Sequence, residues 1–181
     1  MRLFIAFGFS EPSRALLCRY AAALRDLAAG GTYPDSSSYH VTLAFLGECE
    51  RDRAAAVEAA IRASVRGRDA IPATIGGVGS FDRQDGKIVW TGVSGGDALQ
   101  ELHAALCTEL EKRGFVLPDA DKRNDYRPHV TLGRNVLVKD ADLEKLPDEK
   151  GTETLSRVSL MLSARVRGQM RYTELSSFDL G

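Results

Sequence analysis

With 181 residues, of which 44% are hydrophobic and 27% charged, the chain is long enough for one domain with a sizeable core and has the composition of a soluble globular protein. Its net charge of −1 argues against broad nonspecific binding to nucleic acid, so any contact with RNA must come from a local patch. The apolar start, residues 3–9, is too short for a membrane span or a signal-peptide core, and the three scattered cysteines suit a reducing compartment. We therefore expect a cytoplasmic protein that does not associate with membranes.

The first half of the chain alternates strand and helix patterns. A helix is predicted to end at Gly30-Gly31, and Asp85-Gly86 is a hairpin signal between two apolar runs. The predicted elements, in order, are a strand over 2–8, a helix over 11–29, a strand over 39–46, a charged helix over 51–66, and strands over about 73–81 and 87–94.

The second half repeats this order, and no linker separates the halves. Its predicted elements are a helix over 97–113 that stops at Gly114, a polar loop over 118–127, a strand over 128–132, a weaker helix around 140–146, and strands near 156–164 and 171–179. We predict an α+β fold that forms a single bilobal domain over 1–181 with internal duplication. Each of its two pseudo-symmetric lobes is an antiparallel sheet backed by helices, and a central cleft lies between them.

The tetrapeptide His-Val-Thr-Leu occurs at 40–43 and again at 129–132, in a chain with only three histidines. By chance, the second histidine would be followed by Val-Thr-Leu on the order of once in a few thousand trials. Both copies lie in apolar, β-branched runs typical of strands, where residues i and i+2 share a face. Each His and its Thr then point the same way, so two such strands can present a general acid, a general base and two hydroxyls to one groove.

Two other interpretations of the histidines compete with this one. A single strand histidine is usually a hydrogen-bonded structural residue, but core packing has no use for a duplicated polar pair at this spacing. A metal site competes because histidine is a common ligand. The motifs contain no carboxylate or cysteine at ligand spacing, and Cys18, Cys49 and Cys107 are far from each other and lie outside both motifs. Zinc and iron sites usually need at least three protein ligands, so we expect no metal.

At these motifs the chain resembles the 2H phosphoesterase superfamily, and in particular its bacterial and archaeal RNA 2′,3′-cyclic phosphodiesterase branch, also called 2′-5′ RNA ligase-like or LigT-like. The resemblance covers essentially the whole chain and implies the same bilobal fold. It rests on the opening Arg2-Leu3-Phe4-Ile5-Ala6, the block His40-Val41-Thr42-Leu43-Ala44-Phe45-Leu46-Gly47-Glu48, the block Arg127-Pro128-His129-Val130-Thr131-Leu132-Gly133-Arg134, and strands around 160–163 and 172–175.

Hydrolysis of a 2′,3′-cyclic phosphate needs a base for water and an acid for the departing ribose oxygen. One neutral and one protonated imidazole can fill both roles without metal or cofactor. The resemblance assigns His40 as proton donor and His129 as proton acceptor, an order that the residues alone do not decide. The hydroxyls of Thr42 and Thr131 are placed to stabilise charge on the phosphoryl oxygens.

The two motifs differ at the fifth residue after the histidine, which is Phe45 in one and Arg134 in the other. In a regular strand the side chain five residues after the histidine points to the opposite face of the sheet. Glycine in a strand often marks a bulge, which changes the direction of the next side chain. A bulge at Gly133 would turn Arg134 to the face of the histidine. Arg134 is then a candidate phosphate ligand; the alternative is a solvated charge. Phe45 is a candidate for stacking on a nucleobase; the alternative is core packing.

Three further features remain open. Arg157, Arg165, Arg167 and Arg171 form a local basic excess that could reach RNA phosphates, or could simply protect an exposed edge. Tyr126 could stack on a base or staple its loop. His103 is expected on the flank of its helix, without a functional role.

Three functions are compatible with the sequence. The first is a metal-independent phosphodiesterase that opens RNA-terminal 2′,3′-cyclic phosphate to leave a 2′-phosphate. The second is 2′-5′ ligation of RNA, or cleavage of 2′-5′ linked oligonucleotides, at the same site. The third is a nucleotide- or RNA-binding module without catalysis, which would need neither proton-transfer group. The expected partner is RNA bearing a cyclic phosphate end, and the protein is expected to be a monomer.

Overall fold

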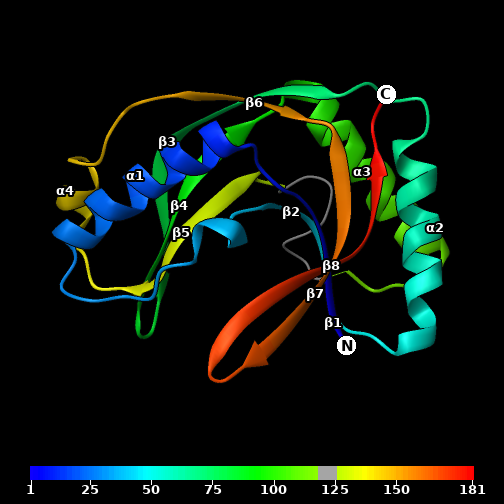
Figure 1. The fold of residues 1–181 in the computed structure, drawn as a ribbon, viewed down its shortest axis with the longest axis horizontal. Coiled ribbons are helices and arrows are strands. Elements are labelled where there is room, and N and C mark those ends of the chain that lie inside the picture. The colour runs from blue at the N-terminus through cyan, green and yellow to red at the C-terminus, as the bar shows by residue number, and fades with distance from the viewer. Residues whose placement is uncertain (118–125) are drawn as a thin grey trace.

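The computed structural model describes residues 1–117 and 126–181, which form two four-stranded antiparallel sheets (Figure 1). Most of the polar loop predicted over 118–127 lies outside these ranges. The first sheet has the order β2-β1-β7-β8 and the second β5-β4-β3-β6. The strands are β1 (Arg2–Phe7), β2 (Val41–Glu48), β3 (Ile71–Arg83), β4 (Gly86–Ser94), β5 (His129–Val136), β6 (Gly151–Leu155), β7 (Arg157–Val166) and β8 (Gln169–Asp179).

The sheets do not follow the division of the chain into consecutive halves. The first sheet joins the two ends of the chain, because β1 and β2 pair with β7 and β8, whereas the second sheet is built from the middle. The repeated order is found in two units, β1-α1-β2 and β4-α3-β5, in each of which the two strands pair antiparallel. The expected two-sheet α+β architecture is confirmed, but the two C-terminal strands belong to the first sheet.

The helices of these two units are exchanged between the sheets (Figure 1). Helix α1 (Glu11–Leu27) follows β1 of the first sheet but packs against β5 and β6 of the second. Helix α3 (Gly96–Lys112) follows β4 of the second sheet but packs against β2 of the first and against α2 (Ala54–Val65), which covers β7 and β8. The buried side chains of both sheets and these helices form one continuous core.

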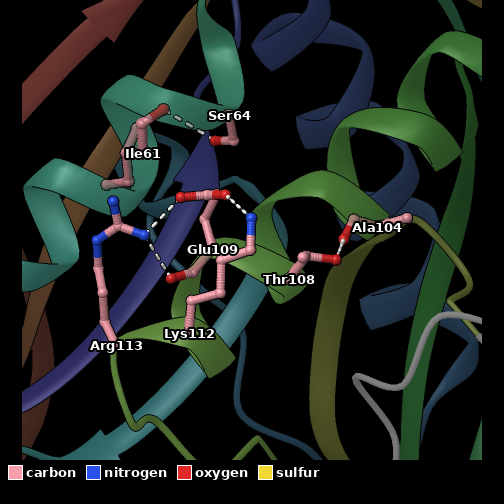
Figure 2. Close-up of polar contacts among 7 residues, drawn as sticks. All are labelled: Ile61, Ser64, Ala104, Thr108, Glu109, Lys112 and Arg113. Atoms are coloured by element: carbon pink, nitrogen blue, oxygen red, sulfur yellow. Dashed lines mark hydrogen bonds and ion pairs between the residues drawn. The ribbon is translucent and has the colours of Figure 1, made fainter.

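Helix α3 has a strongly amphipathic sequence and a reinforced end. Its buried positions include Leu99, Leu102, Leu106 and Leu110, the spacing of one helical face. At its C-terminus Glu109 accepts hydrogen bonds from Lys112 and from Arg113, and these two bonds lower the pKa of the glutamate (Figure 2). The helix ends where Gly114 takes a positive φ of 77°, as the sequence predicts.

Smaller elements differ more from the sequence-based expectations. The helix predicted around 140–146 is a single turn, α4 (Asp140–Leu143), and two 3₁₀ turns, η1 (Ser36–Ser38) and η2 (Arg51–Arg53), precede β2 and α2. The hairpin at Asp85-Gly86 is confirmed, with Arg83 paired to Gly86. Strand β6 was not predicted, because the polar run Gly-Thr-Glu-Thr-Leu lacks a strand pattern; it pairs with β3 at the edge of the second sheet.

The two histidine-containing strands occupy equivalent places. Strand β2 is an edge strand of the first sheet and β5 an edge strand of the second, and the two strands approach each other. Non-local pairing therefore brings the two motif strands near each other. Within the described residues, no helix is long and apolar enough to cross a membrane.

Candidate active site

The two motif histidines are fixed in the same way by their own backbone. The Nδ1 atom of His40 lies 2.7 Å from the carbonyl oxygen of Ser38, and Nδ1 of His129 lies 2.7 Å from that of Arg127. A carbonyl can only accept a hydrogen bond, so Nδ1 of each ring carries the proton. The remaining nitrogen, Nε2, is thereby reserved for proton transfer with a ligand.

Aromatic rings surround each imidazole. The His40 ring centroid lies 4.9 Å from that of Phe4 and 5.2 Å from that of Tyr172. The His129 ring lies 5.6 Å from Phe81 and 5.8 Å from Trp90. These contacts restrict rotation of both rings, so each Nε2 keeps a defined direction.

A β-bulge follows the threonine in the first motif. Ala6 of β1 pairs with Thr42, but the preceding residue, Ile5, pairs with Ala44. Leu43 is therefore the additional residue. Leu43 and Ala44 are both fully buried. The alternation of faces is thereby reset, and Phe45 lines the same cavity as Thr42.

The second motif carries the equivalent bulge. Trp90 of β4 pairs with Thr131 and Val89 pairs with Gly133, so Leu132 is additional. Leu132 and Gly133 both face the interior, and a Cβ atom at Gly133 would lie only 2.7 Å from Val136. Arg134 then emerges into the cavity, as expected from the glycine in the sequence.

The cavity beside the first motif has a volume of about 250 Å³ and contains two arginines. No acidic side chain occurs among its described lining residues, so it suits an anionic ligand. His129 and Thr131 lie outside this lining, on the facing strand. The cavity is lined by Arg2, Phe4, His40, Thr42, Phe45, Arg134, Ser163, Met170 and Tyr172.

The environment of His40 favours its neutral form. Burial lowers the pKa of its imidazole below the ordinary value of 6.5, and the hydrogen bond to Ser38 acts in the opposite direction. The positive charges of Arg134 and His129 lower the pKa further. Protonation of His129 therefore disfavours protonation of His40.

Comparisons with known proteins identify the family of this chain. The sequence profile of the 2′-5′ RNA ligase superfamily matches residues 14–167. The chain belongs to this superfamily. It is 30% identical over 135 residues, 74% of this chain and 70% of the relative, to the RNA 2′,3′-cyclic phosphodiesterase of Thermotoga maritima. It is 28% identical to the protein of the same name from Methanothermobacter thermautotrophicus, across 99% of both chains.

Solved structures share the superfamily fold. The structure of TT0787 from Thermus thermophilus superposes with a TM-score of 0.83 at 22% identity, covering 99% of this chain and 98% of that one. The structure of E. coli LigT complexed with 3′-AMP gives a TM-score of 0.75 at 24% identity, covering 99% and 96%. The resemblance inferred from the sequence is thus confirmed.

The cavity beside the first motif also contains residues that the sequence analysis did not single out as site residues. Arg2 pairs with Ser163, and Ser163 pairs with Tyr172, so the three side chains form one row across the first sheet. The Arg2 guanidinium lies 5.0 Å from the ring centroid of Phe45. This row joins β1 to strands near the C-terminus, a pairing that no local pattern reveals.

The prediction that His103 lies on the flank of its helix is wrong. The residue is fully buried on α3, its Nδ1 lies 2.9 Å from the carbonyl of Leu43, and its ring stacks on Tyr126 at 3.9 Å. The Tyr126 hydroxyl donates to the carbonyl of Thr42 at 3.0 Å. The pair therefore binds two successive carbonyls at the bulge of β2 and ties this strand to the segment that enters β5, which favours the structural interpretation of Tyr126.

Proposed function

We propose that the protein is an RNA 2′,3′-cyclic phosphodiesterase that opens the terminal cyclic phosphate of RNA to leave a 2′-phosphate. The observation that carries the proposal is the approach of the two motif strands, which puts Arg134 of the second strand in the cavity of His40, with each histidine held in the same tautomer by its own backbone. The names of the Thermotoga and Methanothermobacter relatives support the substrate class.

The proposed reaction uses the two free Nε2 atoms. His129 removes a proton from water, and the water oxygen attacks phosphorus. The bond between phosphorus and the ribose 3′-oxygen breaks, and His40 gives its proton to that oxygen. The histidines end with exchanged protonation states, which solvent restores. Each transfer contributes roughly 10²–10⁴-fold to the rate, and neither requires a metal or a cofactor.

Charge stabilisation is assigned to the side chains around the reacting phosphate. We propose that the hydroxyls of Thr42 and Thr131 donate to the phosphoryl oxygens, and that Arg134 contacts them through its planar guanidinium. Phe45 is proposed to stack on the base of the terminal nucleotide. Its position in the cavity beside Arg2 supports this role.

The donor role of His40 depends on the substrate. In the free protein its pKa is lowered, chiefly by burial, which favours the neutral ring. A bound phosphodiester carries a negative charge and offsets the charge of Arg134, so binding raises the pKa of His40. The substrate thereby promotes protonation of the group that must act as acid.

The decisive experiment is incubation of the protein with RNA ending in 2′,3′-cyclic phosphate, in the presence of EDTA, followed by mapping of the product phosphate. The expected result is a 2′-phosphate formed at an undiminished rate. Loss of turnover in EDTA that is restored by added metal would contradict the proposed chemistry, and a 3′-phosphate product would contradict the assigned bond cleavage.

Substitution of the histidines tests their role as a unit. His40→Ala and His129→Ala should each lower kcat by roughly 10³-fold or more, and the double variant should be little worse than either. Circular dichroism checks that each variant is folded. A near-normal rate in either single variant would remove that histidine from the mechanism.

We further propose that the protein acts in the cytoplasm as a monomer. Within the described residues no disulfide joins its three cysteines, Cys18, Cys49 and Cys107, which is consistent with a reducing compartment. Light scattering of the purified protein measures the oligomeric state directly.

A further inference from the structure

The hairpin formed by β7 and β8 projects from the rest of the fold (Figure 1). Its turn consists of Arg167 and Gly168, which have φ angles of 50° and 82°. Two successive positive φ angles are typical of a tight two-residue turn that matches the twist of the strands. The hairpin therefore has a defined register up to its tip, where Val166 pairs with Gln169.

This register assigns the exposed arginines to opposite faces. Met170 and Tyr172 line the cavity. Arg165 pairs with Met170, and directly paired residues of antiparallel strands point to the same side, so Arg165 lies on the cavity face. Arg171 pairs with Ala164, one position away, and lies on the reverse face.

Three arginines at this end of the hairpin have no acidic partner among the described residues. Arg165, Arg167 and Arg171 are exposed, and none of them forms an ion pair with any residue that the structure describes. At the other end of the hairpin, Arg157 is bonded to Glu174 at 2.9 Å. Val166 and Met170 are also exposed, at 49% and 39%. The tip thus combines exposed cations with apolar surface, which suits a nucleic-acid strand.

The size of the cavity indicates where a second nucleotide must go. At about 250 Å³ the cavity is smaller than pockets that enclose a drug-sized ligand, roughly 300–1,000 Å³. It therefore accommodates the terminal nucleotide, and the preceding nucleotide lies outside. Arg165 is two residues beyond Ser163, roughly 7 Å further along β7, a distance comparable to one nucleotide in an extended strand.

We propose that Arg165, assisted by Arg167, binds the phosphodiester that precedes the cyclic end, so that the hairpin favours RNA strands over cyclic mononucleotides. The inference rests on the proposed function and extends it from the reacting phosphate to the polynucleotide. Arg171 offers a matched control, because it carries the same charge on the opposite face of the same hairpin.

The test compares adenosine 2′,3′-cyclic phosphate with a short RNA oligonucleotide that ends in 2′,3′-cyclic phosphate. In Arg165→Ala, the ratio of kcat/KM for the oligonucleotide to that for the mononucleotide should fall roughly three- to tenfold, mainly through KM. In Arg171→Ala the ratio should change by less than about twofold. A plot of log(kcat/KM) against log[salt] for the oligonucleotide should have a negative slope, and in Arg165→Ala the magnitude of this slope should be smaller by about 0.7.

Equal losses in Arg165→Ala and Arg171→Ala would overturn the inference, because they would indicate only general attraction between charges. An unchanged ratio in Arg165→Ala would do the same. Binding of the fluorescently labelled oligonucleotide to the His40→Ala variant separates this inference from the proposed function. Weaker binding after Arg165→Ala but not Arg171→Ala supports the hairpin subsite even if the wild-type protein opens neither substrate, a result that would refute the proposed reaction alone.

Discussion

At the scale of single residues, the site is organised by backbone carbonyls and by positive charge. Each motif histidine is oriented by the carbonyl two residues before it. Arg134 reaches the cavity of His40 and lowers the pKa of that imidazole. Arg134 therefore has two separable effects, one on the phosphate and one on the acid.

Arg134→Gln and Arg134→Lys separate these effects. Removal of the positive charge in Arg134→Gln raises the pKa of His40, so the limb of the kcat/KM–pH profile that reports His40 should move to higher pH. If His40 is the donor, this is the alkaline limb. Arg134→Lys keeps the charge and should leave that limb at its wild-type pH. Its rate should be only partly restored relative to Arg134→Gln, because an ammonium group cannot form the planar bidentate hydrogen bonds of a guanidinium.

The rate in Arg134→Gln should fall by roughly 10²–10³-fold, as for loss of one donor to a developing oxyanion. Steady-state kinetics across a series of buffers measures both quantities. Movement of the acidic limb in Arg134→Gln would instead identify His40 as the base and exchange the two proposed roles.

At the scale of elements, one bulge in each motif strand explains why Phe45 and Arg134 line the cavity. Each is five residues after its histidine, and in a regular strand a side chain at that position would point to the opposite face. The bulge of β5 depends on Gly133, where a Cβ atom would lie 2.7 Å from Val136 and 3.2 Å from the ring of Tyr33. Ala44 occupies the equivalent position in β2 and is buried without difficulty. The two bulges therefore tolerate different side chains.

Gly133→Ala should destabilise the protein by about 1–3 kcal/mol, because the crowded strand must shift. It should also lower kcat, because the shift displaces Arg134. Urea unfolding and steady-state kinetics measure the two effects. Ala44→Gly is the matched control and should cost about 0.5–1 kcal/mol with little change in kcat. Wild-type kcat in Gly133→Ala would show that the bulge does not position the arginine.

The sequence predicts elements and motifs well because their signals are local. The leucine periodicity of α3, the glycine that ends it and the Asp-Gly hairpin all depend on neighbouring residues. The burial of His103 escaped prediction because its partner, the Leu43 carbonyl, lies on another element. The row from Arg2 to Tyr172 and the membership of β7 in the first sheet also arise from pairing between distant segments.

At the scale of the whole molecule, the exchanged helices bind the two sheets into one unit. Helix α1 links β1 to the second sheet, and α3 links β4 to the first. If one sheet unfolds, the other loses the packing of a helix that covers it. We therefore expect residues 1–181 to behave as one cooperative domain, although the structure contains two sheets.

Urea unfolding tests this cooperativity. The single tryptophan, Trp90, lies on β4 and reports on the second sheet through its fluorescence. Circular dichroism reports on the helices of both sides. The two transitions should coincide, with one midpoint and one slope. Separate midpoints would show that the lobes unfold independently.

The absence of acidic side chains from the described cavity lining has a consequence for release of the product. The cyclic diester brings one negative charge, whereas a 2′-phosphate monoester carries nearly two at neutral pH, since its second pKa is about 6. Arg2, Arg134 and a protonated histidine attract the more highly charged species more strongly. The product thus competes with the substrate for the cleft, and the competition weakens as the pH falls below about 6 and the product loses its second charge. Turnover then depends on proton loss from the protein after hydrolysis, which weakens its hold on the phosphate.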